Sequence, residues 1–144
     1  MTQVSEPRCV FTEGSMTLPA GYREQTVNML TSPSGPSLNL SRDRLQPGED
    51  FAAWLDRQRV MLKKGLSGYH ALDEQPAALG DNLFHGVTLL YHFQPQQDQT
   101  LYQRQAVFPV TASDMLIFTL TCAHALTGQD EALFSACLSS YRRP

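Results

Sequence analysis

The fold of this 144-residue chain is decided by the stretch NLFHGVTLLYHFQ, residues 82–94. As a β-strand, this stretch has large apolar side chains at both sets of alternating positions. One set comprises Leu83, Val87, Leu89, Tyr91 and Phe93, and the other comprises Phe84, Thr88 and Leu90. An antiparallel sheet with one face in water shows alternating apolar and polar residues instead. The stretch therefore predicts a central strand with both faces covered.

A second predicted strand, Asp114–Cys122, has the same two-sided character, because Met115 and Ile117 alternate with Leu116 and Phe118. The centre of the sheet therefore needs cover on both sides, and the chain offers two helices of modest length. In one arrangement both helices cover one face and a subunit or ligand covers the other, since large apolar patches seldom stay open. In the other arrangement one helix packs on each face. The pattern alone favours neither.

The remaining elements follow from Pro/Gly punctuation and side-chain periodicity. One helix is expected to begin after Pro47-Gly48-Glu49-Asp50, with acidic residues in its first turn, and to end at Lys63-Lys64-Gly65. The other helix is expected at Gln129–Tyr141. Further strands are expected at Cys9–Thr12, Ser15–Leu18, Glu24–Ser32, Ser37–Arg42, Tyr69–Leu79 and Thr100–Val110.

The order of these elements shows no regular βαβ alternation. We therefore expect an α+β fold, in which a curved, mainly antiparallel β-sheet is flanked by two main helices. We also expect residues 1–144 to form a single domain, with residues 1–8 as a flexible tail.

Composition argues against several classes of protein. The formal net charge is −3, whereas a binder of the phosphate backbone needs a basic surface, so no nucleic-acid partner is expected. The widely spaced Cys9, Cys122 and Cys137 do not form a disulfide framework and suit a reducing compartment. No apolar signal-peptide core and no run of about 18 apolar residues occurs. We therefore expect a cytoplasmic protein without direct membrane insertion.

Catalytic and metal-binding patterns are missing from the sequence. The four histidines form neither an HExxH motif nor a close pair at ligand spacing, and His85 and His92 would face opposite ways along one strand. A GxSxG elbow, a Walker loop and a GxGxxG motif are also missing. We expect no catalytic residues, no metal and no cofactor, and hence not an enzyme.

Two glutamines interrupt apolar surfaces. Gln58 shares a helical stripe with Leu62 and Leu66, and Gln105 shares a strand face with Val107. A buried amide must find a hydrogen-bonding partner. That partner is either a nearby backbone group, or a polar side chain or loosened carbonyl of a bound guest helix; glutamine makes comparable bonds between helices inside membranes.

An ordered set of short motifs resembles a known family. These motifs are Phe11-Thr12-Glu13-Gly14-Ser15 with Leu18-Pro19, Gln25-Thr26-Val27-Asn28-Met29-Leu30, Ser41-Arg42-Asp43, Phe51-Ala52, Arg57-Gln58 and Arg104-Gln105. Over about residues 9–142 the chain resembles DcrB-related proteins, and more closely the Eag (effector-associated gene) chaperones of type VI secretion.

The resemblance implies a Mog-like/PsbP-like fold and a homodimer. It also implies that the partner is a cognate type VI effector, a PAAR/Rhs-type protein, whose N-terminal transmembrane helices are kept soluble in a hydrophobic groove and loaded onto the secretion spike. The alternative is a generic DcrB-related/Mog-like protein-binding module without a transmembrane-helix guest. The family pattern matches groove residues to Val27, Met29, Gln58, Leu62, Leu66 and Gln105. We add Leu38, Leu40 and Val107, because alternation along their strands predicts that they point to the same face.

Overall fold

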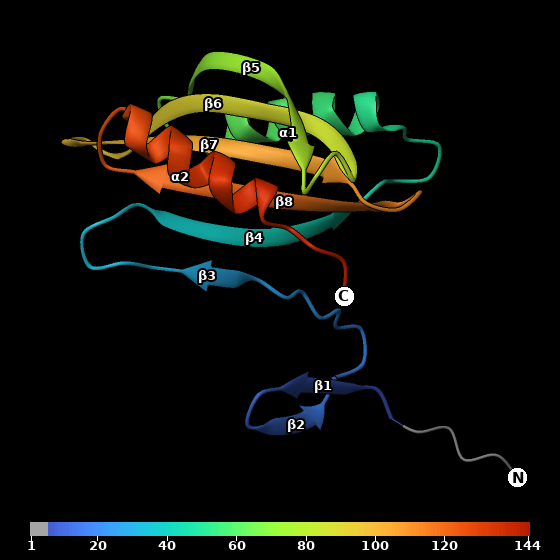
Figure 1. Cartoon of the computed structure of the whole chain (residues 1–144). Helices are drawn as coiled ribbons and strands as arrows, with labels where there is room; N and C mark the ends of the chain where they lie inside the picture. The colour runs from blue at the N-terminus through green and yellow to red at the C-terminus, as the bar shows by residue number, and fades with distance from the viewer. Residues whose placement is uncertain (1–5) are drawn as a thin grey trace, which may run out of the picture.

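The computed structural model describes residues 6–144, and over this range the chain has an α+β architecture (Figure 1). Its main sheet has six strands in the order β3-β4-β8-β7-β6-β5, and every neighbouring pair is antiparallel. The strands are β3 (Asn28–Leu30), β4 (Ser37–Arg44), β5 (His70–Leu79), β6 (Phe84–Gln96), β7 (Gln99–Pro109) and β8 (Asp114–Cys122). The expected α+β class and antiparallel sheet are confirmed.

One helix packs on each face of this sheet, which resolves the two arrangements that the sequence left open (Figure 1). Helices α1 (Phe51–Gly65) and α2 (Gly128–Ser139) each cover a separate buried cluster. Under α1 lie Trp54, Leu55, Leu89, Tyr91, Phe93, Val107, Met115 and Ile117. Under α2 lie Leu38, Leu79, Ala106, Phe108, Phe118, Leu120, Cys122, Phe134 and Leu138. The two-sided apolar strands are thus covered by the chain itself.

A side chain caps the N-terminal end of α1, and basic residues lie at its C-terminal end. Asp50 is the N-cap, and its carboxylate accepts a 2.8 Å hydrogen bond from the Ala53 amide. Lys63 and Lys64 lie in the last turn, where cations complement the helix dipole. The expected acidic first turn is wrong, because Glu49 and Asp50 precede the helix.

Helix α2 begins with a capping box in which Thr127 and Asp130 satisfy each other's backbone amides. The Thr127 amide donates to the Asp130 carboxylate over 2.9 Å, and this bond lowers the pKa of Asp130. The helix ends at Ser139, two residues before the expected end at Tyr141.

The N-terminal part of the chain forms a small hairpin apart from the main sheet (Figure 1). It consists of β1 (Arg8–Phe11) and β2 (Gly14–Thr17). The expected tail over residues 1–8 lies largely outside the described residues, and Arg8 already belongs to β1. The expected strand over residues 24–32 is shortened to β3. Within the described part of the chain, neither helix has the length and apolarity needed to span a bilayer.

Candidate functional site

Register across the sheet defines a row of side chains on the face that α1 covers. Gln105 of β7 pairs with Leu89 of β6 and with Thr119 of β8. Thr119 pairs in turn with Asn39 of β4, which pairs with Met29 of β3. Paired residues of antiparallel strands share a face, and Leu89 lies in the cluster under α1. We call these five residues the Gln105 row.

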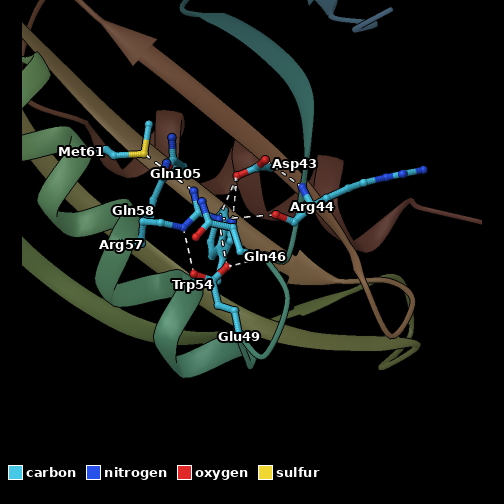
Figure 2. A network of polar contacts seen from close by, with 9 residues as sticks. All are labelled: Asp43, Arg44, Gln46, Glu49, Trp54, Arg57, Gln58, Met61 and Gln105. Atoms are coloured by element: carbon cyan, nitrogen blue, oxygen red, sulfur yellow. Dashed lines mark hydrogen bonds and ion pairs between the residues drawn. The ribbon is translucent and has the colours of Figure 1, made fainter. Parts of the chain in front are cut away.

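Gln58 of α1 makes a direct hydrogen bond to this row (Figure 2). Its Nε2 donates to Oε1 of Gln105 over 2.8 Å, and Nε2 of Gln105 donates to Oγ1 of Thr119 over 3.3 Å. Gln105 and Thr119 are each 7% exposed, whereas Gln58 is half-buried. The buried amide therefore finds its partners in side chains of the same chain, as buried polar groups require.

A network of polar contacts fixes the N-terminal half of α1 against β4 (Figure 2). Trp54, which is fully buried, donates through Nε1 to the Asp43 carboxylate over 2.8 Å. Arg57 donates through Nε and Nη2 to the two oxygens of Glu49, both over 2.9 Å, which is bidentate geometry. These bonds lower the pKa of Glu49. The network thereby helps hold α1 in the position from which Gln58 reaches Gln105.

The adjacent residues Arg104 and Gln105 tie β7 to both helices. They point to opposite faces because successive residues of a strand alternate. Gln105 faces α1, whereas the guanidinium of Arg104 pairs with Glu131 of α2 over 2.8 Å and donates to Thr88 over 3.1 Å. The Arg104-Gln105 motif therefore has a structural role on both faces of the sheet.

Leu62, Leu66 and Met29 lie on the α1 side of the sheet with Gln58 and Gln105, and Val27 lies next to them at the start of β3. Leu62 and Leu66 are half-buried against the α1 cluster. Met29 is 69% exposed at the end of the Gln105 row, and Val27, which directly precedes β3, is 52% exposed. Exposed apolar residues are thus found at the β3 edge of this face.

The other three expected residues are not available on this surface. Leu38 and Leu40 face α2, since they pair with Leu120 and Phe118 of the opposite cluster. Val107 lies on the α1 side but is completely buried. Their selection as groove residues is corrected: two are on the wrong face, and the third is core.

Sequence reasoning missed Met61, which extends the exposed apolar surface onto α1. The Met61 sulfur lies 4.0 Å from Nη1 of Arg57, one helical turn earlier, and Arg57 also contacts the Arg44 carbonyl of β4 over 3.4 Å. Met61 therefore lies on the flank of α1 nearest to β4 (Figure 2). Its position one residue before Leu62, beside the predicted stripe, was the signal available in the sequence.

Two cavities on the molecule lie away from the surface beside α1. A cavity of about 430 Å³ lies on the α2 side, where Arg104, Glu131 and Ser135 contribute to its lining. A second, of about 530 Å³, lies near the C-terminus, with Asp81 and Tyr141 in its wall. Gln58, Gln105 and Met29 line neither one.

The titratable groups show little sign of reactive chemistry. Burial raises the pKa of the Cys122 thiol to about 11, so that it stays protonated and unreactive at neutral pH. His70 and His92 stack with ring centroids 5.0 Å apart on neighbouring strands, a pairing that sequence reasoning missed. Among residues 6–144, no group of three or more His, Cys, Asp or Glu side chains could hold a metal ion.

Comparison with solved structures shows the same fold in other proteins. The protein of unknown function PA94 from Pseudomonas aeruginosa aligns over 96% of this chain and 97% of its own length, with 24% identity and a TM-score of 0.65. The solution structure of cyanobacterial PsbP (CyanoP) from Synechocystis sp. PCC 6803 aligns over 93% of this chain and 89% of its own, with 14% identity and a TM-score of 0.52. The expected PsbP-like fold is confirmed.

Comparison of sequences identifies the family. A search of the curated proteins gave no match. The family model for DcrB matches residues 13–140, which include both helices and the whole six-stranded sheet. The chain therefore belongs to the DcrB family.

Proposed function

We propose that this protein is a non-enzymatic chaperone of type VI secretion, which shields the N-terminal transmembrane helices of a PAAR/Rhs-type effector and aids its loading onto the secretion spike. The observation that carries the proposal is the hydrogen bond between Gln58 and Gln105, on the face whose β3 edge exposes Val27 and Met29. Membership of the DcrB family and the motif resemblance to Eag chaperones support it.

The surface beside α1 offers both kinds of contact that an apolar helix needs. Exposed Val27, Met29 and Met61 can cover guest side chains, and each guest Leu or Phe that is buried contributes roughly 1.5–3 kcal/mol. Among the described residues, the half-buried Gln58 uses one Nε2 hydrogen on Gln105, so its other hydrogen and its Oε1 oxygen can bond a polar group of the guest. Several such contacts give useful affinity after the cost of ordering the two partners. The proposed compartment is the cytoplasm, where the three free thiols would stay reduced.

Replacing Gln58 by alanine is expected to weaken guest capture about tenfold, because it removes the amide that can bond the guest. The free energy of unfolding should fall by roughly 1–3 kcal/mol, since the substitution leaves Oε1 of the buried Gln105 without its donor. The measurement is co-expression with the N-terminal segment of a PAAR/Rhs-type effector, with the soluble effector quantified after pull-down.

The matched control for this test is Gln129→Ala, the same substitution at an exposed position of the other helix. The control should capture as much effector as the wild type. Equal capture by the Gln58→Ala variant would contradict the proposed role of the amide, and an unfolded variant would show that Gln58 only supports the core. If the effector segment stays equally soluble without this protein, the chaperone function itself is wrong.

The alternative function is a generic protein-binding module of the DcrB or Mog type. It is favoured by the presence of one helix and one buried cluster on each face of the sheet, because the chain then needs no guest to complete its core. The two functions differ in whether the apolar side chains at the β3 edge are needed for binding.

We also propose that the protein is a homodimer in which the N-terminal hairpin packs on a second copy. A two-stranded hairpin alone is marginally stable in water, and this one carries the exposed apolar residues Val10, Phe11 and Met16, with Val10 72% exposed. Phe11→Asp is expected to convert a dimer into a monomer, measured as mass by light scattering. A wild-type monomer, or a dimeric variant, would contradict this arrangement.

A further inference from the structure

A second row of polar side chains lies beside the Gln105 row on the α1 face of the sheet. Gln103 of β7 pairs with Thr121 of β8 and with Tyr91 of β6, and Thr121 pairs with Ser37 of β4. Each of these residues is two positions along its strand from a member of the Gln105 row, and such residues point to the same face. We call these four residues the Gln103 row.

Each row contains a series of side-chain hydrogen bonds, and the two series lie side by side. In the Gln103 row, the Tyr91 hydroxyl donates to Oε1 of Gln103 over 2.6 Å, and Nε2 of Gln103 donates to Oγ1 of Thr121 over 3.0 Å. At the Gln105 row, Gln58 of α1 donates to Gln105, and Gln105 donates to the hydroxyl of Thr119 in the same way. Burial raises the pKa of Tyr91, so its hydroxyl stays protonated and can donate.

The two series of hydrogen bonds differ in how exposed their residues are. Gln105 and Thr119 are buried, whereas Gln103, Thr121 and Ser37 are half-buried. Thr121 accepts a bond from Gln103, and its own hydroxyl hydrogen has no acceptor among the described residues 6–144. A polar group arriving on this face can therefore reach the Gln103 row more readily than the Gln105 row.

We infer that Gln103 and Thr121, held in place by Tyr91, form the hydrogen-bonding contact that selects the guest, while Gln105 acts by positioning Gln58. This inference rests on the proposed function and deepens it. The guest is then an apolar helix with two hydrogen-bonding side chains on one face, one of which meets Gln58 and the other the Gln103 row.

The spacing between the rows sets the spacing of the guest's polar groups. Two residues along a strand advance roughly 6.8 Å, and four residues along a helix advance about 6 Å. Trp54 of α1 contacts Asp43 near the end of β4, and Gln58, one turn later, contacts Gln105 near the middle of β7, so the helix advances along the strands. Strand β3 lies beside β4. The surface between α1 and β3 therefore has the direction of the strands. A guest helix lying along this surface would match the two rows with polar side chains four residues apart.

The test uses the full-length protein and two synthetic helical peptides. Each peptide contains about 20 Leu and Ala residues between terminal lysines; one carries asparagine at two central positions four residues apart, and the other carries alanine there. The wild-type protein should bind the asparagine peptide about tenfold more tightly. Thr121→Val and Tyr91→Phe should each reduce this preference to about threefold, because the second asparagine can still meet Gln58, and neither should weaken binding of the alanine peptide.

Thr100→Val is the matched control, because it removes a threonine hydroxyl from the opposite face of β7, outside both rows. It should leave the peptide preference intact. Equal binding of the two peptides by the wild type would overturn the inference and leave the chaperone function standing. A reduced preference in Thr100→Val but not in Thr121→Val would also overturn it. Failure of the wild type to bind either peptide would contradict the proposed function itself.

Discussion

Replacing Gly86 by alanine is expected to destabilise the protein by about 4 kcal/mol or more, the range that single substitutions reach only through severe steric or electrostatic conflict. A Cβ atom at this position would lie 1.9 Å from the Val107 carbonyl oxygen and 2.8 Å from Cδ1 of Phe108. The first conflict is with backbone, which cannot turn aside as a flexible side chain can. Strands β6 and β7 would have to separate at Gly86 to make room for the added methyl group.

Gly65→Ala provides the control for this prediction. Nothing lies within 4 Å of a Cβ added at Gly65, and alanine favours a helix over glycine by roughly 1 kcal/mol. Urea unfolding followed by the fluorescence of the buried Trp54 would measure both variants. A Gly86→Ala protein that unfolds within about 1 kcal/mol of the wild type would show that the two strands can move apart at little cost.

The same close approach links the fold to the proposed site. Strand β7 carries both Gln103 and Gln105, and its register with β6 places Tyr91 opposite Gln103. A shift of one residue in this pairing would move both glutamines to the other face. The glycine therefore contributes to the alignment of the two polar rows as well as to stability.

Much of the fold could be predicted because its strands carry clear alternation. The two-sided apolar pattern of β6 and β8 indicated cover on both faces, and the structure provides it. The pattern did not predict which face each helix covers, because side-chain periodicity shows which residues of a strand share a face but not which element packs against that face. The N-terminal segments were harder, since β3 is only three residues long.

The candidate site was predicted in part. Periodicity placed Gln58 on an apolar helical stripe and Gln105 on an apolar strand face, and the family resemblance put both in one groove; their side chains are in contact. Leu38 and Leu40 were assigned to this face wrongly, because the facing of β4 depends on its register with β8. Register is fixed by contacts between distant segments, which one strand's sequence does not contain. The Gln103 row was missed for the same reason.

The combined substitution Val27→Asp and Met29→Asp is expected to weaken guest capture by more than about 100-fold. Each apolar side chain that covers a guest contributes roughly 1.5–3 kcal/mol, and the two carboxylates would also have to be desolvated against an apolar helix. Both side chains are more than half exposed in the free protein, so the fold should be retained. Capture of the effector's N-terminal segment measures the first effect, and circular dichroism checks the second.

A matched pair, Leu72→Asp with Leu133→Asp, separates loss of this surface from the added negative charge. These leucines are similarly exposed, but they lie on edge strand β5 and on α2, away from the β3 edge. The control should retain capture, because the same two charges are then placed where no guest is expected. Retained capture in the Val27/Met29 variant would favour the generic binding module, since binding would then not need the apolar edge. Loss of capture in both pairs would mean that guest binding responds to net charge instead of to a defined surface.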